Sequence, residues 1–386
     1  MNWRRRINPV FMEKAAVLAF FIALALLLRL LLSPFMSHDM SSLLTWLLHV
    51  KKHGILAYGT TFTTYPPLYS YLLGLVSLIT PPISSVLAIK LISIAFDFVC
   101  SFFVYRVVSL RFRDGYAPIL ALIAFLFAPT VILNSSVWGQ NDMVYTVWLV
   151  ACVYFLATEH HWAATLCFGL ALAVKLQAIF LAPLLIVLCL RRALPWKTLL
   201  LIPVPYLVSI VPAWALGSPL HDLLTVYFGQ TAAFPLLSDN AASLYAWIPN
   251  RFFAELLPAS LVFAFAMVCL YILVASRRRT PLTTPVVVQL ATFSVLLMPF
   301  VLPEMHERFF FAADVLSILF AFYFPSYFFV PILVGGVSLF SYLPYLFAVT
   351  PVSYSVLAFV QLGTIVILAR HLMTTLFPHG PNPLVG

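Results

Sequence analysis

Charged residues are scarce in this sequence. Asp, Glu, Lys and Arg make up 9% of its 386 residues, whereas they make up about a quarter of an ordinary soluble protein. A soluble enzyme is therefore excluded. A disordered chain is excluded as well, because 63% of the residues are hydrophobic. At about 20 apolar residues for each membrane crossing, the chain has room for roughly a dozen crossings. We expect an all-α polytopic membrane protein, with a single transmembrane domain over residues 1–386.

Cysteine is also rare, and its placement excludes further classes. The five cysteines all lie within apolar runs, with no CxxC pair and no Cys–His spacing suited to zinc. We therefore expect neither a disulfide framework nor a structural metal. The excess of 21 Lys and Arg over 12 Asp and Glu does not indicate a nucleic-acid partner, because the positions of the basic residues matter more than their sum.

Twelve apolar runs predict the crossings. They are residues 15–32, 86–108, 117–133, 142–157, 162–174, 178–190, 198–216, 257–275, 285–302, 309–324, 327–346 and 352–369. The first run follows three arginines, as the core of a signal peptide does. It is too long for such a core, carries Arg29 and lacks a small-x-small cleavage site, so we expect it to remain as a crossing.

Basic residues in short loops mark the cytoplasmic side of a membrane protein. With twelve crossings, every basic cluster falls on one side, and both termini are cytoplasmic. The clusters are Arg4–Arg6, Arg106 with Arg111 and Arg113, Arg191 and Arg192 with Lys197, Arg277–Arg279, and Arg370.

One apolar stretch, residues 66–80, is not counted as a crossing. It opens with Pro66-Pro67, and counting it would move most basic clusters to the outer side. We expect a re-entrant or interfacial helix there, within a first outer loop over residues 33–85. Residues 162–190 are predicted to form a short hairpin that brings Lys175 near the outer face. A large outer loop is expected over residues 217–257.

The predicted outer side carries many charges for loops that only connect helices. Seven basic and seven acidic residues fall there: Arg29, Lys51, Lys52, Lys90, Lys175, Arg251 and Arg308, with Asp39, Asp142, Asp222, Asp239, Glu255, Glu304 and Glu307. Such a mixed cluster over an apolar body predicts a site that faces the outer leaflet.

Asp39 is the first candidate for this site. It follows His38 and lies just past the first crossing, at the membrane–water boundary. A carboxylate there can keep its charge while it faces a desolvated cleft, as a general base must. Asp39 is equally well placed to cap the helix that starts near Ser41. The sequence leaves these two roles open.

A second group of polar residues lies at the outer turn Trp138-Gly139-Gln140-Asn141-Asp142, just where the next helix begins. Trp138 fits an interfacial aromatic residue. Asp142 fits either a helix cap or a site residue, since an acidic side chain stabilises a helix N-terminus.

A third turn places Glu304, His306, Glu307 and Arg308 within six residues of Pro303. Exposed ion pairs contribute only about 0–1 kcal/mol each, so local pairing is a weak reason for such crowding. Arg308 and Lys175 could bind a phosphate together, because arginine offers a planar fork and lysine a point charge.

In this order, these segments resemble the GT-C superfamily of integral-membrane glycosyltransferases. The matching residues are Asp39, Gly54…Tyr58…Tyr65-Pro66-Pro67, Trp138-Gly139-Gln140-x-Asp142, Lys175-x-Gln177 and Met305-His306-Glu307-Arg308. The likeness covers residues 1 to about 325 and is greatest to prokaryotic relatives of the second mannosyltransferase of GPI-anchor synthesis.

The resemblance implies a GT-C-like fold and a polyprenyl-phosphate-linked donor. A hexose, with mannose as the first choice, would pass to a lipid, glycan or protein acceptor on the non-cytoplasmic side of the plasma (inner) membrane. Asp39 would be the general base of an inverting transfer. Cationic side chains would stabilise the leaving lipid phosphate. The absence of a DxD motif agrees with a lipid-linked donor.

The same resemblance implies roles for the remaining candidates. Asp142 matches a second acidic position, which orients the acceptor or binds metal, so Asp39 and Asp142 could share a divalent ion (Mg²⁺ or Mn²⁺). No full ligand set is evident in the sequence. The residues assigned to the donor are Lys175, His306, Glu307, Arg308, Gln177 and Tyr65. Those assigned to the acceptor or to support of the site are His38, Gln140, Asn141, Glu304 and Asn240.

Two other classes of function compete with an enzyme. A transporter or flippase of lipid-linked sugars would carry ionisable groups near the membrane midplane, and Asp97 and Asp314 fall within predicted crossings. However, the sequence shows no internal repeat, and its acids and bases concentrate at one face. A structural assembly subunit would not need the outer cluster at all.

Overall fold

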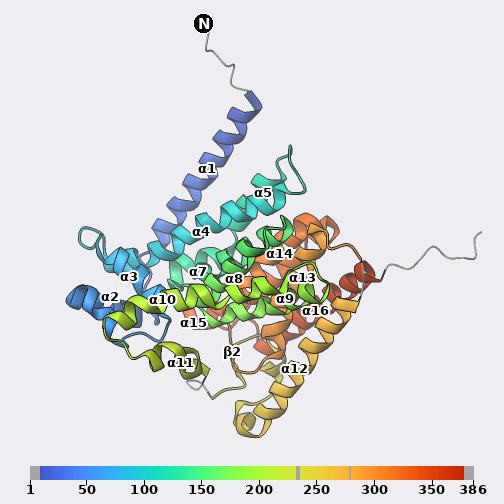
Figure 1. The fold of residues 1–386 in the computed structure, drawn as a ribbon. Coiled ribbons are helices and arrows are strands. Elements are labelled where there is room, and N and C mark those ends of the chain that lie inside the picture. The colour runs from blue at the N-terminus through green and yellow to red at the C-terminus, as the bar shows by residue number, and fades with distance from the viewer. Residues whose placement is uncertain (1–8, 232–234, 278–279, 378–386) are drawn as a thin grey trace, which may run out of the picture.

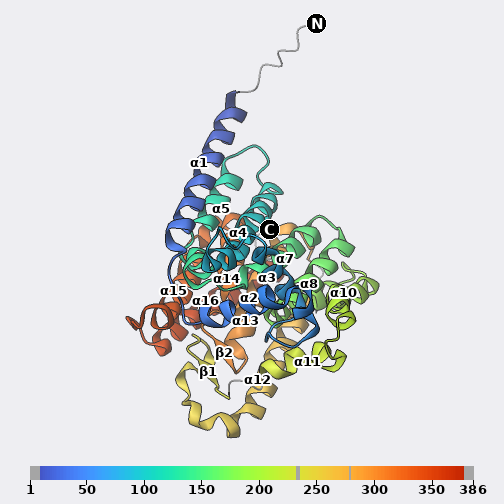
Figure 2. The ribbon, with the colours of Figure 1, turned by 90° about the vertical axis from the view of Figure 1, so that its left-hand side faces the viewer.

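The computed structural model describes residues 9–231, 235–277 and 280–377, which form one helical body (Figures 1 and 2). The first helices are α1 (Pro9–Leu32), α2 (Met40–His53), α3 (Pro67–Ser77), α4 (Ser85–Ser109), α5 (Ala117–Leu126), α6 (Pro129–Ile132), α7 (Asp142–Ala157) and α8 (His161–Val174). The later helices are α9 (Ala182–Leu190), α10 (Pro203–Ala215), α11 (Leu220–Thr231), α12 (Phe253–Arg277), α13 (Thr284–Val301), α14 (Phe311–Tyr323), α15 (Val330–Phe347) and α16 (Tyr354–Leu376).

Short elements join these helices. A π-helical turn, η2, covers Leu133–Trp138, and 3₁₀ turns cover Gly54–Gly59, Leu176–Leu181, Trp196–Leu201, Leu244–Trp247, Asn250–Phe252 and Pro325–Tyr327. Two short strands, β1 (Ser238–Asp239) and β2 (Met305–His306), pair in parallel. They join the loop that precedes α12 to the turn that follows α13.

Among the described residues, seven helical segments are long and apolar enough to span a membrane. They contain α1, α4, α10, α12, α13, α15 and α16. The segments of α5 and α6 would form an eighth span if counted together, with a bend of 49° between them. The protein is therefore an all-α, multi-pass membrane protein that belongs in a lipid bilayer, as its composition predicts.

The predicted count of twelve crossings is not confirmed. Four of the twelve runs fold into shorter apolar segments, which contain α7, α8, α9 and α14. The 14 residues of α8 cover about 21 Å along the helix axis, whereas the hydrocarbon core of a bilayer is about 30 Å thick. The count of twelve crossings remains a prediction. It requires these short segments to cross the membrane at positions where other helices surround them.

The stretch predicted to be re-entrant or interfacial forms α3, which has 11 residues. Pro67 stands at its first position, where a missing N–H has no helical partner to lose. The helix packs against α2 and α4 and is too short to span a membrane.

Different loops lie at the two ends of the helical body. The loops predicted to be cytoplasmic contact one another at one end, near the loop before α5 (Figure 1). The contacts run from Lys14 to Asp114, Arg111 to Tyr323, Tyr327 to His371, Arg191 to Thr280 and Thr280 to Leu376. α2, α11 and the two strands lie toward the opposite end (Figures 1 and 2).

The helix α7 lies in the middle of the body, packed against α4, α8 and α14. Nearly all of its residues are buried around the whole helix. Such a helix can be apolar on every side because other helices, rather than water, surround it. Since α7 begins at Asp142, this acidic residue lies inside the packed body.

Candidate functional site

Lys90 of α4 holds together the two chain segments from which the candidate site is built. Its ammonium is buried and lies 2.6–3.0 Å from four carbonyl oxygens, those of Ser33, Phe35, Ser136 and Val137. A buried cation needs such hydrogen-bond acceptors. Two of them belong to the turn after α1 and two to η2. Lys90 therefore acts inside the fold, not as part of an exposed outer cluster.

The turn between η2 and α7 is fixed by its backbone. The Ser37 hydroxyl donates to the carbonyl oxygen of Trp138 at 2.7 Å, and the Ser93 hydroxyl donates to that of Gln140. Gly139 between them has a φ of +78°, a conformation that favours glycine. A Cβ atom there would lie 2.4 Å from the Met40 Cε atom. Glycine thus allows the turn to pack against the start of α2.

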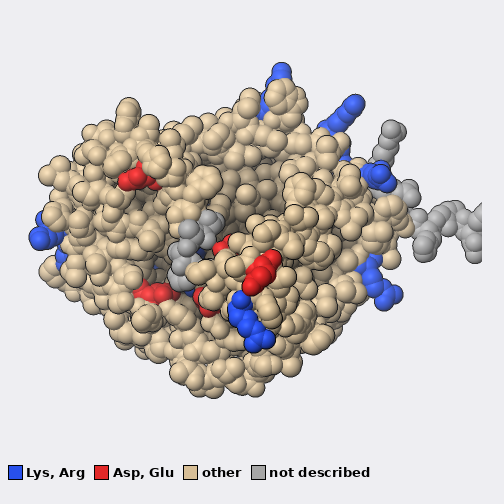
Figure 3. Space-filling model, turned by 90° about the horizontal axis from the view of Figure 1, so that it is seen from below, with Lys and Arg blue, Asp and Glu red and all other residues tan. Residues whose placement is uncertain are grey.

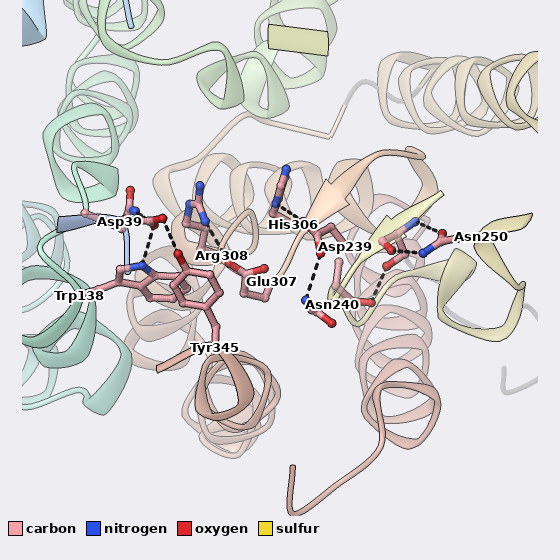
Figure 4. A network of polar contacts seen from close by, with 12 residues as sticks. Asp39, Trp138, Asp239, Asn240, Asn250, His306, Glu307, Arg308 and Tyr345 are labelled. Carbon is pink, nitrogen blue, oxygen red and sulfur yellow. Dashed lines mark hydrogen bonds and ion pairs between the residues drawn. The ribbon is translucent and has the colours of Figure 1, made fainter. Parts of the chain in front are cut away.

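Asp39 precedes α2, but its side chain does not cap that helix. One carboxylate oxygen accepts hydrogen bonds from the Trp138 indole N–H, at 2.9 Å, and from the Gln140 amide. The other oxygen accepts a hydrogen bond from the hydroxyl of Tyr345 on α15 (Figure 4). Of the two roles that the sequence leaves open, the structure excludes side-chain capping.

These contacts keep Asp39 ionised. Burial alone would raise the pKa of the Asp39 carboxyl, but the nearby Arg308 guanidinium and the three hydrogen bonds outweigh it and lower this pKa below its ordinary value. The Arg308 guanidinium lies 5.5 Å from the centre of the Trp138 ring, which stacks on Tyr345 at 4.9 Å. Asp39 is therefore a carboxylate at neutral pH, held beside a cation.

Arg308 lies among several acidic groups. Its Nη1 atom donates to the Glu307 carboxylate at 3.0 Å (Figure 4). Burial would lower the pKa of Arg308, but Glu307, Tyr65, Asp142 and Asp39 together raise it above its ordinary value. Burial raises the pKa of Glu307, against the influence of Arg308. The guanidinium thus balances three carboxylates that come from separate segments.

Asp142 forms a second, deeper pair with Lys175. The Lys175 ammonium contacts one Asp142 oxygen, and the Asn134 amide donates to the other at 2.8 Å. The same ammonium lies 5.7 Å from the centre of the Tyr65 ring. Both charged side chains are buried. Asp142 stands in the first turn of α7, but the hydrogen bonds of its carboxylate go to the side chains of Lys175 and Asn134.

His306 belongs to a third part of the cluster. Its Nδ1 atom lies 3.1 Å from the Asp239 carboxylate, in register with the β1–β2 pairing. The Asn240 amide donates to the other Asp239 oxygen at 3.0 Å (Figure 4). The hydrogen bond from His306 lowers the pKa of Asp239. The outer loop before α12 thereby supports the turn that carries Arg308.

Several predicted site residues keep unused hydrogen-bonding atoms. Within the described part of the chain, both side-chain polar atoms of Asn141, the Gln177 Oε1 atom and the Arg308 Nε atom are buried and have no hydrogen-bond partner. Buried polar atoms in native proteins are almost always paired. Water or a ligand that bridges these atoms would satisfy them.

Most of the predicted residues therefore meet at one end of the molecule. Asp39, Gln140, Glu307 and Arg308 form one cluster, and Asp142 with Lys175 forms another within the electrostatic reach of Arg308. This face of the molecule is hollowed, and acidic side chains lie around the hollow (Figure 3).

Two predicted residues play smaller parts. The His38 ring meets the edge of Tyr345 at 6.5 Å between ring centres. Glu304 contributes its backbone N–H, which donates to the Leu237 carbonyl at 2.9 Å, and burial raises the pKa of its carboxyl. Neither side chain joins the ion pairs of the cluster.

Three contributors were missed by sequence reasoning. Trp138, expected at the lipid interface, is fully buried and donates to Asp39. Tyr345 lies beyond the region of the resemblance, so no motif pointed to it. The sequence places Asp239 only among the outer charges, because a pair of two-residue strands leaves no pattern that would join it to His306.

The residues present do not form a ready metal site. Among the described residues, no three His, Cys, Asp or Glu side chains come together as metal ligands would. Asp39 already accepts three hydrogen bonds, and Asp142 is neutralised by Lys175. A divalent ion shared by the two carboxylates stays a prediction.

Comparison with known proteins gives no family for this chain. No protein-family model matches it, and no curated protein sequence matches it significantly. The resemblance described above therefore rests on the residues themselves.

Proposed function

We propose that the protein is a membrane glycosyltransferase of the GT-C type, located in the plasma (inner) membrane. It transfers a hexose, with mannose as the first choice, from a polyprenyl-phosphate-linked donor to an acceptor hydroxyl on the non-cytoplasmic side. The observation that carries this proposal is the position of Asp39. Its carboxylate does not cap the helix, stays ionised and lies near the partly buried cation Arg308.

In the proposed mechanism, Asp39 takes the proton of the acceptor hydroxyl. The acceptor oxygen forms a bond to the anomeric carbon as the bond from that carbon to the lipid phosphate breaks, with inversion. Negative charge grows on the departing phosphate, and preorganised cations stabilise such charge. Arg308 and Lys175 supply this stabilisation. Each now pairs with a carboxylate, Glu307 and Asp142 respectively, and the unpaired Nε atom of Arg308 offers a further donor.

The direct test is to incubate the purified protein, in lipid nanodiscs, with polyprenyl-phosphate derivatives of mannose, glucose, galactose and a pentose. Mass spectrometry would follow release or transfer of each sugar. We expect cleavage of at least one donor by the wild type, and a loss of about 100-fold or more in Asp39→Asn, because a general base contributes roughly that much.

A matched control is Asp114→Asn, which changes an exposed carboxylate in the loop before α5, at the other end of the molecule. It should leave the rate unchanged. Movement of intact donor across a vesicle membrane without cleavage would instead support the transporter or flippase. A near-normal rate in Asp39→Asn would refute Asp39 as the base and leave Asp142 as the better candidate.

A further inference from the structure

A separate cleft lies beside the candidate site, between the segment that precedes α3 and the corner between α10 and α11. Its lining includes the aromatic rings of Tyr58, Phe62 and Tyr65, the carboxylate of Asp222, and five Ser or Thr residues, among them Thr61 and Ser70. None of the mechanism's charged side chains lines it, but Tyr65 belongs to both places, since Lys175 lies 5.7 Å from its ring centre. Tyr65 therefore links the cleft to the Asp142–Lys175 pair.

The walls of this cleft are fixed by specific contacts. The Tyr71 hydroxyl donates to the Ser209 carbonyl at 2.9 Å and accepts from the Ala213 N–H at 3.1 Å. It thus inserts into the hydrogen-bond ladder of α10, where Pro212 already interrupts that ladder. Gly59 lies so close to α10 that a Cβ atom would be 2.3 Å from the Leu216 carbonyl oxygen. These contacts join the two walls without filling the space between them.

The chemistry of the lining suits a neutral, hydroxyl-rich ligand. Flat aromatic faces can pack against the C–H face of a sugar ring, while hydroxyl and carboxylate oxygens can bond to its hydroxyl groups. The described lining residues include no Lys or Arg, so the cleft offers no cation for a phosphate. Among the described residues, neither the Ser70 nor the Thr61 hydroxyl is taken up by another hydrogen bond, and Asp222 has only its neighbour His221, at 3.4 Å.

We propose that this cleft binds the sugar portion of the acceptor. The proposal rests on the glycosyltransferase function above and divides the molecule into two subsites. The donor phosphate goes to Arg308 and Lys175, and the acceptor sugar goes to the cleft, with Tyr65 at the boundary. The acceptor hydroxyl would then approach the donor from the side of α3 and α11.

Binding can be tested without any transfer reaction. A cysteine at Thr61, an exposed position in the cleft, would be labelled with a maleimide in nanodiscs. We expect octyl α-mannoside or free mannobiose to slow this labelling about threefold at a concentration of about twice the dissociation constant, by simple occupancy. Octanol should not slow it. Protection by octyl mannoside alone would indicate a glycolipid acceptor, and protection by mannobiose as well would indicate a free glycan.

Matched positions exist for this test. A cysteine at Ser42, exposed on α2 and outside the cleft, should be labelled at the same rate with and without sugar. Protection of the Thr61 cysteine by octanol or by farnesyl phosphate, and not by the sugars, would overturn the proposal in favour of a groove for the lipid donor. The absence of protection by either sugar would also overturn it.

Two substitutions in the cleft sharpen the test. Phe62→Ala and Asp222→Asn should each raise the sugar concentration needed to protect the Thr61 cysteine by about tenfold. Each removes one of the main contacts to the ligand. Leu224→Ala, at an exposed residue of α11 outside the cleft, should leave this concentration unchanged.

The two proposals fail in different ways. If Phe62→Ala and Asp222→Asn raise the KM for acceptor but leave donor hydrolysis by water unchanged, both proposals stand. If the wild type cleaves no donor while the sugars still protect the Thr61 cysteine, the glycosyltransferase function fails and the sugar site remains. If donor is cleaved normally and no sugar protects, only the acceptor cleft is wrong.

Discussion

The carboxylate of Asp39 accepts hydrogen bonds from side chains that lie far from it in the sequence. Tyr345 is 306 residues away, and Trp138 is 99 residues away. Hydrogen bonds to the charged form of an acid lower its pKa, and each such bond contributes about 1.5–3 kcal/mol. At a half-buried group, solvent reduces this contribution.

Tyr345→Phe should therefore raise the pKa of Asp39 toward its ordinary value. The catalytic form is the carboxylate, so activity is present above this pKa and is lost as the pH falls through it. We expect the acidic limb of the pH–rate profile to move to higher pH in Tyr345→Phe, because one of the hydrogen bonds that lower the pKa of Asp39 is lost. Tyr327→Phe, at the other end of the molecule, should leave the profile in place. An unchanged acidic limb in Tyr345→Phe would mean that Asp39 does not control it.

Arg308 requires a test that separates folding from catalysis. Arg308→Ala leaves the buried Glu307 carboxylate without its partner, and breaking a buried pair costs about 3–5 kcal/mol. The double variant Arg308→Ala/Glu307→Gln removes both charges. We expect the double variant to recover the thermal stability but to remain at least about tenfold slower in donor cleavage.

Arg308→Lys keeps the charge but loses the planar fork, so it should recover only part of the rate. If the double variant cleaves donor at the wild-type rate, the Glu307–Arg308 pair has only a structural role.

The sequence identifies individual site residues better than it identifies their partners. Asp39, Gln140, Asp142, Lys175 and Arg308 stand out because charged and amide groups are rare in so apolar a chain. An aromatic residue such as Tyr345 does not stand out in a sequence that contains 17 Tyr and 35 Phe. Its contact with Asp39 depends on how α15 packs, which no local pattern encodes.

Among the secondary-structure elements, apolar runs predict where helices lie but not where they break. Residues 117–133 appear as one run, yet α5 ends at Leu126 and a new helix begins at Pro129, bent by 49°. Proline lacks the N–H that would continue the helix, and it restricts the residue before it. This break leads into the π-helical turn η2, which carries Trp138 to Asp39. The irregular turn that follows this broken run is therefore the part that contributes to the site.

The Lys90 ammonium joins the turn after α1 to η2 through four carbonyl oxygens, and this link can be tested by substitution. Lys90→Met keeps much of the side-chain volume but leaves four buried carbonyl oxygens without their donor. We expect a loss of about 2–5 kcal/mol in stability, measured by thermal unfolding in nanodiscs. Lys52→Met, at an exposed position of α2, should have little effect. Equal unfolding temperatures for the two variants would show that Lys90 does not hold these segments together.

For the molecule as a whole, two observations distinguish its two ends. Positive charge predicts which loops are cytoplasmic. A series of contacts that runs from Arg111 through the C-terminal end of α16 to Arg191 places those loops together at one end. Asp39, Arg308 and the cleft between the segment before α3 and the α10–α11 corner lie toward the other end. The charge pattern could be read from the sequence, whereas the separation of the two ends required the packing of the helices.

This difference between the two ends predicts which residues face the outside of the cell. Cysteines at Ser42 on α2 and at Arg113 in the loop before α5 occupy exposed positions at opposite ends. A membrane-impermeant maleimide added to intact cells should label the Ser42 cysteine and not the Arg113 cysteine, and permeabilised cells should show labelling of both. The unmodified chain provides the background, because its five cysteines are buried or half-buried. Labelling of the Arg113 cysteine in intact cells would reverse the orientation and place Asp39 on the cytoplasmic side, where the proposed donor chemistry would have to be abandoned.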